Sequence, residues 1–121
     1  MRKLELHDIH INDGLMSSPV WKLGSGATVA AVAILAAVNC KTESCVGKYF
    51  QIVKRGQLFA SLEEIAHIGN ASVEDVIEAI DCLVKHDLAH AEVGNDDKVL
   101  LTLHLDNMPW LKLDDIEGQE S

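Results

Sequence analysis

The segment "ATVAAVAILAAV", residues 27–38, constrains the fold most because it has almost no polar face. Small and aliphatic residues throughout are typical of a helix that is covered on nearly every side. The run is about half as long as a membrane span requires, so a buried helix is the better interpretation. This helix must either lie at the centre of a domain or share a surface with a partner. We expect Ser25 to cap its start and Asn39 to lie near its end.

The small side chains of this segment would allow it to pack against a partner chain. Ala30, Ala33 and Ala37 would let a symmetry mate approach closely, and a two-fold contact is the commonest arrangement of this kind. The sequence thus predicts a homodimer through residues 27–38. The competing interpretation is that the N-terminal arm and the tail around Trp110 fold back over the helix.

Composition and charge limit the classes of function. The chain has 121 residues, of which 48% are hydrophobic and 24% charged, and this suits one globular domain with one core. Aromatic residues make up only 4%, which disfavours base-stacking platforms. The net charge of −9 repels nucleic acid and anionic membranes unless basic residues cluster locally. We therefore expect no membrane association.

The cysteines and the opening segment indicate a reducing compartment. Cys40, Cys45 and Cys82 are an odd number, and "MRKLELHDIHIND" is charged where a secretory signal would be apolar. We expect free thiols and a cytoplasmic location. A Cys-x4-Cys spacing without a second clear pair is a weak zinc signal, as is "HDIH" at residues 7–10. We predict no metal site and no cofactor.

Two helices joined by a tight turn are predicted over residues 61–87. Ser61 with Glu64 and Ser72 with Asp75 are capping pairs, in which each side chain satisfies a backbone donor at a helix start. The sequence "GNA" between the helices breaks the periodic pattern.

The second of these helices is strongly amphipathic. At about 100° per residue its apolar residues fall within one arc, whereas Glu74, Glu78, Asp81 and Lys85 fall on the opposite arc. The apolar set is Val73, Val76, Ile77, Ile80, Leu83 and Val84.

The remaining segments complete a fold prediction. Residues 40–48 are predicted as a loop and 49–53 as a short strand, and residues 88–93 and 98–105 alternate as a hairpin around "GNDD". This order predicts an α+β fold of the winged helix-turn-helix class, with three helices and a C-terminal β-hairpin wing. We divide the chain into an N-terminal arm and docking loop (1–24), a winged-helix domain (25–105) and an acidic tail (106–121).

A family resemblance agrees with this fold. The "VW" before the first helix, the run "GKYFQIVKRGQLFASLEEIA" and the Val-x-x-Ala-Ile-x-x-Leu helix are similar to the winged-helix N-terminal domain of DnaD-like replication initiation proteins of phages and plasmids. The resemblance covers residues 14–105. It implies DNA binding, self-association and contact with helicase-loading partners. We expect no counterpart here of the helical C-terminal domain that is common in those initiators.

The candidate site residues form two groups of opposite charge. A helix that binds in the major groove uses Arg, Lys, Asn or Gln against base edges, so the acidic helix is predicted to contact a protein partner or to face water. That group is Glu74, Asp75, Glu78 and Asp81. The one basic stretch is either a nucleic-acid contact or an ordinary solvated loop, and it contains Lys41, Lys48, Lys54 and Arg55.

These observations predict an interaction protein and not an enzyme. "GSGA" precedes a helix but lacks the lysine of a phosphate-binding loop, and no nucleophile motif is present. We expect a cytoplasmic module of a phage or mobile element that acts in DNA replication initiation or its control, mainly through protein contacts, with weak or no duplex binding. One alternative is a DNA-binding regulator that uses residues 41–55. Another is an acidic inhibitor that mimics DNA phosphates.

Overall fold

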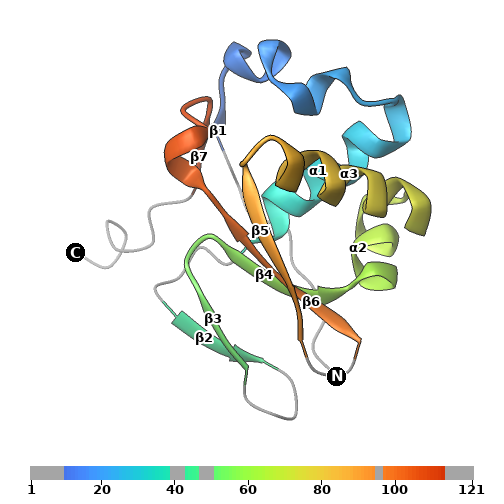
Figure 1. Ribbon diagram of the computed structural model, residues 1–121, viewed down its shortest axis with the longest axis vertical. Helices are drawn as coiled ribbons and strands as arrows, with labels where there is room; N and C mark the ends of the chain where they lie inside the picture. Colours follow the sequence, from blue (N-terminus) through green and yellow to red (C-terminus); the bar gives the residue numbers. More distant parts are fainter. Residues whose placement is uncertain (1–9, 39–42, 47–50, 95–96, 114–121) are drawn as a thin grey trace.

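Three helices cover one face of a three-stranded antiparallel sheet in the computed structural model (Figure 1). The structure describes residues 10–38, 43–46, 51–94 and 97–113. The α-helices are α1 (Ser25–Ala37), α2 (Leu62–Gly69) and α3 (Val73–Lys85), and the 3-10 turns are η1 (Asp13–Ser17), η2 (Pro19–Lys22) and η3 (Leu105–Asn107). The strands are β1 (His10–Ile11), β2 (Glu43–Val46), β3 (Gln51–Lys54), β4 (Gln57–Ser61), β5 (Ala89–Val93), β6 (Lys98–Leu103) and β7 (Leu111–Lys112). The predicted α+β class, the three helices and the C-terminal hairpin are confirmed.

The central sheet has the strand order β4-β6-β5, so the hairpin made by the last two strands is joined to a strand that precedes α2. Leu58 of β4 lies opposite Leu101 of β6, and Ala91 of β5 lies opposite the same residue. Residues two apart on a strand share a face, so this register turns alternate apolar side chains toward the helices.

Two strands differ from the sequence prediction. Glu43–Val46 was expected to be loop but forms β2, which pairs with β3. Gln57–Ser61 was not recognised as a strand, yet it forms β4. Strand β4 pairs with β6, about forty residues later in the sequence, and β2 pairs with the next strand, β3. The residues of β2 and β4 alone therefore give no strong strand signal.

The core surrounds α1, of which eight residues are buried. Ile34 and Leu35 are fully covered, as are Ile65 of α2, Val76 and Leu83 of α3, and Leu101 of β6. This explains why the segment has no polar face: helices α2 and α3 and turn η2 all contact it.

The residues predicted to form a dimer contact lie inside the chain, which corrects the argument for that contact. Ala30 is 0% exposed, and Ala33 and Ala37 are each 7% exposed. A Cβ added at Gly69, the last residue of α2, would lie 3.0 Å from the Cβ of Ala33. The small residues of α1 therefore admit a helix of the same chain, and a second copy could reach them only by opening the core.

The N-terminal arm and the tail complete this core, as the competing interpretation expected. The backbone N–H of Asn12 donates to the carbonyl of Trp110 at 2.9 Å, next to the β1–β7 pair. Leu15, Val20 and Trp110 are buried in the same cluster as the helices. The described parts of all three predicted segments thus share one core.

The predicted N-cap residues are confirmed for α2 and α3 and wrong for α1. Ser61 with Glu64 and Ser72 with Asp75 form the predicted capping boxes of α2 and α3. The N-cap of α1 is Gly24, so the prediction of Ser25 as the cap was wrong. The Thr28 hydroxyl, in the first turn of α1, is within hydrogen-bond distance of the carbonyls of Val20 and Leu23 and so connects the start of the helix to the preceding segment.

Candidate functional site

In the first turn of α3, the Asp75 side chain takes part in the helix cap. The Ser72 hydroxyl accepts from the backbone N–H of Asp75 at 3.1 Å, and the Asp75 carboxylate accepts from the N–H of Ser72 at 3.3 Å. A Cβ added at Gly26 would meet the Asp75 carboxylate, so this side chain also faces the start of α1. Asp75 therefore has a structural role, which sets it apart from the other predicted partner-binding residues.

The remaining carboxylates of the predicted group lie on the outer side of α3. Glu74, Glu78 and Asp81 are exposed, and Lys85 at the end of the helix is the one cation beside them on α3. An exposed carboxylate surface of this kind repels a phosphate backbone and attracts cationic side chains. All four predicted residues lie on α3, and three of them expose their carboxylates.

Two hydrophobic residues of α3 are exposed next to these carboxylates. Ile77 is 52% exposed and Val84 is 44% exposed, whereas Val76 and Leu83 are fully buried. The sequence pattern placed all four in one apolar arc. Only part of that arc faces the core, because α1, α2, β5 and η2 contact the helix but leave Ile77 and Val84 exposed.

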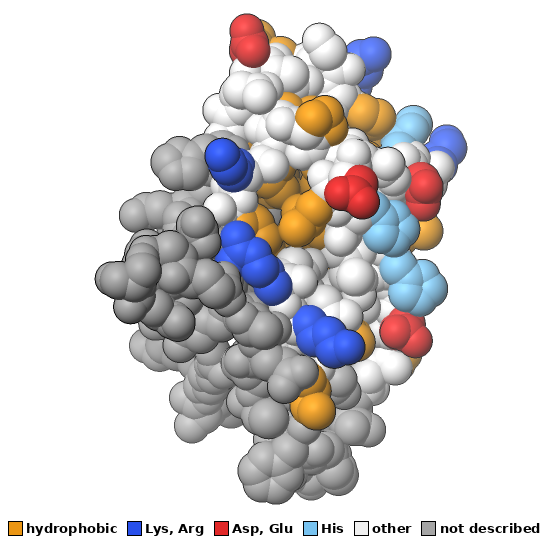
Figure 2. Space-filling view, turned by 90° about the vertical axis from the view of Figure 1, so that its left-hand side faces the viewer, with side chains coloured by type: hydrophobic (Ala, Val, Ile, Leu, Met, Phe, Trp, Pro, Cys, Tyr) orange, Lys and Arg blue, Asp and Glu red, His pale blue; other side chains and the backbone are white. Residues whose placement is uncertain are grey.

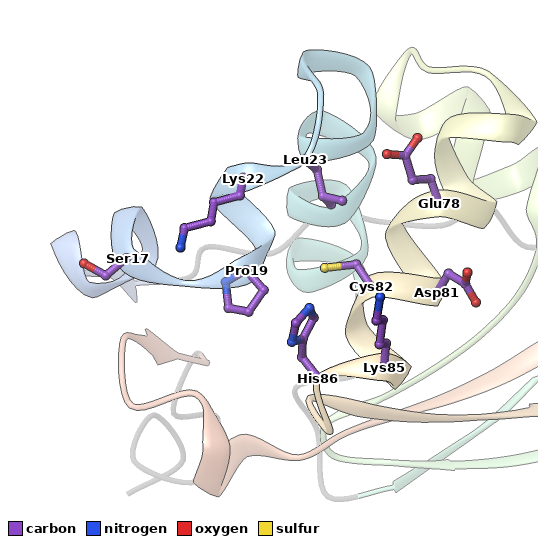
Figure 3. Close-up of a pocket in the computed structure, with 9 residues that line it drawn as sticks. All are labelled: Ser17, Pro19, Lys22, Leu23, Glu78, Asp81, Cys82, Lys85 and His86. Carbon is purple, nitrogen blue, oxygen red and sulfur yellow. The ribbon is translucent and has the colours of Figure 1, made fainter.

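A groove lies between α3 and the η1–η2 segment (Figure 3). Its volume is about 410 Å³, and it combines apolar residues with charges of both signs. The lining residues are Ser17, Pro19, Lys22 and Leu23 from the N-terminal segment and Glu78, Asp81, Cys82, Lys85 and His86 from α3 and its end. The mixture of two lysines with two carboxylates favours no single ligand charge.

The Cys82 thiol points into this groove but is not set up as a nucleophile (Figure 3). Burial raises the pKa of the thiol, and the nearby carboxylates of Glu78 and Asp81 raise it further, although Lys85 opposes them. A raised pKa keeps the thiol protonated near neutral pH, and the thiolate is the reactive form. Cys82 therefore acts as a packing residue at the base of the groove.

The predicted basic stretch is described only in part. Lys54 is exposed at the end of β3 and Arg55 is half-buried in the turn that follows, whereas Lys41 and Lys48 lie outside the described residues. Figure 2 shows several Lys and Arg side chains spread over one face of the molecule, with a cluster of hydrophobic side chains beside some of them.

The hairpin is joined to α2 by an ion pair that sequence analysis missed. The ammonium of Lys98 lies 3.2 Å from Glu64 Oε1, and it also lies 5.8 Å from the centre of the Phe59 ring. Burial raises the pKa of the Glu64 carboxyl, but hydrogen bonds from Ser61 and the charge of Lys98 outweigh this and leave the pKa below its ordinary value. The capping box at Ser61 predicted the position of Glu64 but gave no signal for its partner on a distant strand.

The described part of the chain has neither a metal-binding cluster nor a membrane-spanning helix. Among the described residues, no group of three His, Cys, Asp or Glu side chains is placed to hold a metal ion. No described helix is both long and apolar enough to cross a membrane. The side chains of Cys40 and Cys45 lie outside the described residues.

No protein-family model, curated protein or solved structure matches the chain. The resemblance to DnaD-like initiators stays a prediction.

Proposed function

We propose that this protein is a winged-helix interaction module that contacts another protein through the exposed side of α3. The fold part of the proposal is supported by the order α1, β4, α2, α3, β5, β6 and by the sheet order β4-β6-β5. In this interpretation α2 and α3 are the helix-turn-helix and β5–β6 is the wing. The module is non-enzymatic and cytoplasmic.

The proposed contact with a protein partner is supported by the kinds of side chain that α3 exposes. Its outer side has Glu74, Glu78 and Asp81 together with the exposed Ile77 and Val84. Major-groove recognition requires donors matched to base edges, and phosphates line both walls of the groove. Carboxylates in that position would be repelled without a compensating contact, whereas a basic protein surface would be attracted.

The resemblance to DnaD-like initiators gives this module its biological setting. We propose that it works in the initiation of DNA replication, or in its control, in a phage or mobile element. A protein in that setting meets helicases, loaders and other nucleic-acid-binding proteins whose surfaces are basic. The acidic side of α3 is complementary to such surfaces.

Titration of a fluorescent DNA duplex with the purified protein tests this proposal. At physiological salt we expect binding no tighter than ordinary non-specific affinity, with a Kd of about 10⁻⁴ to 10⁻⁶ M or weaker. Replacing Glu78 with Lys should strengthen any binding because it removes repulsion at the duplex. Tight, sequence-selective binding by the unmodified chain would overturn the proposal.

A DNA-binding regulator is the second candidate, and the exposed Lys54 favours it. In that case Lys54→Glu with Arg55→Glu should abolish duplex binding. The third candidate, an inhibitor that mimics DNA phosphates, predicts that the chain displaces DNA from a basic DNA-binding protein. A replisome adaptor would bind such a protein without displacing its DNA.

A further inference from the structure

Helix α3 carries an apolar stripe with the spacing of a coiled-coil seam. Val73, Ile77, Ile80 and Val84 follow one another at intervals of four, three and four residues. At about 100° per residue they lie within a narrow arc of the helix surface. Alternating intervals of three and four, filled by β-branched residues, are the pattern by which one helix packs lengthwise against another.

The chain itself covers only half of this seam. Val73 and Ile80 are partly buried and pack against the core, whereas Ile77 and Val84 are 52% and 44% exposed. The two exposed residues are seven positions apart, which places them two turns or about 10 Å apart along the helix. Single exposed apolar residues need no explanation, but two on one continuous stripe indicate a surface for a partner helix.

The borders of the seam differ in chemistry. On one side of the seam lie Val76 and Leu83, each one residue before a seam residue, and both are fully buried. On the other side, Glu74 and Asp81 occupy equivalent positions, each one residue after a seam residue, and both are exposed. In helix pairs these border positions carry the charges that select the partner. Only the acidic border is open to an incoming helix.

We infer that α3 is the docking surface for a basic amphipathic helix of another protein. That helix would place aliphatic residues on Ile77 and Val84 and Lys or Arg beside Glu74 and Asp81. This inference rests on the proposed function and adds the chemistry of the partner. A second copy of this chain does not fit, because two antiparallel α3 helices related by a two-fold axis would bring their carboxylates together.

The test uses a designed helical peptide with Leu in a seam of three- and four-residue spacing and Lys at the border positions. Its binding to the full chain is measured by calorimetry at low and physiological salt. We expect saturable one-to-one binding that weakens as salt increases, since the border contacts are ionic. A peptide with Glu at the border positions should not bind.

Matched variants locate the binding. Ile77→Gln with Val84→Gln should weaken the affinity about tenfold or more, whereas Val93→Gln, at an 87% exposed position on β5, should leave it within about twofold. Glu74→Gln with Asp81→Asn should weaken it and reduce its salt dependence, whereas Glu92→Gln with Asp106→Asn should do neither. Circular dichroism checks that each variant keeps its helix content.

Three results would each overturn the inference: no binding of the basic peptide, equal binding to the Ile77/Val84 variant, or a dimer of the unmodified chain that this variant dissociates. The first two leave the proposed function standing if the duplex titration also shows no tight binding, whereas a dimer through α3 would remove it too, since a second copy would occupy that side of the helix. A tight duplex complex would remove the proposed function itself, whatever the peptide does.

Discussion

At the scale of single residues, Glu64 has two structural roles. It closes the capping box of α2 and forms the ion pair with Lys98 that holds β6 to that helix. Both side chains are about one-quarter exposed, since Glu64 is 28% and Lys98 27% exposed. Partial burial limits solvent screening, so this pair contributes more than a fully exposed one.

We expect Glu64→Gln to lower the free energy of unfolding by about 1 kcal/mol or less at pH 7, because Gln keeps an oxygen for the Ser61 N–H but loses the charge. The pKa of Glu64 is lowered in the folded state, so its contribution is present above the unfolded pKa and is lost as pH falls through the folded pKa. The difference between the two proteins should therefore shrink below about pH 4.

Urea unfolding of both proteins between pH 7 and pH 3 measures this, with Glu63→Gln as the control at the exposed neighbouring position. A difference that stays constant over this range would show that the ion pair does not stabilise the fold.

At the scale of elements, local signals in the sequence were sufficient for some features and not for others. The capping boxes at Ser61 and Ser72 depend on residues three apart, and both were predicted. Strand β4 depends on pairing with β6, whose residues follow about forty positions later, so five residues alone could not identify it.

The candidate site shows the same division. Helical periodicity predicted that Glu74, Glu78 and Asp81 lie together, and they do. It could not predict that Ile77 and Val84 are exposed, because periodicity defines an apolar arc but not how much of that arc a neighbour covers. The groove between η2 and α3 also needed the structure, since its two sides are more than fifty residues apart.

Helix α1 gives a prediction that separates its two possible roles. Ala33→Glu should prevent folding, because Ala33 is 7% exposed and faces Gly69, so the carboxylate would be buried without a partner. Val29→Glu, on the same helix at a 49% exposed position, should change the free energy of unfolding by about 0.5 kcal/mol or less.

Size-exclusion chromatography and urea unfolding of the two variants distinguish the outcomes. A folded, monomeric Ala33→Glu protein beside a dimeric parent would instead support the homodimer through α1, which was predicted from the sequence.

At the scale of the whole molecule, charge and architecture point in different directions. The proposed winged-helix arrangement is one that commonly binds DNA, but the net charge of −9 and the outer side of α3 oppose it. The two are compatible if α3 contacts a protein partner, as proposed. Any residual affinity for nucleic acid is then expected from the Lys54 region and not from α3.

The most direct measurement of this claim is a pair of nuclear magnetic resonance titrations of the isotope-labelled chain, one with a DNA duplex and one with the basic helical peptide. We predict that the peptide shifts the amide signals of α3 around Ile77, Asp81 and Val84, and that the duplex leaves these signals in place at equal concentration. Saturating shifts of the α3 signals on addition of duplex, with none on addition of peptide, would contradict the account.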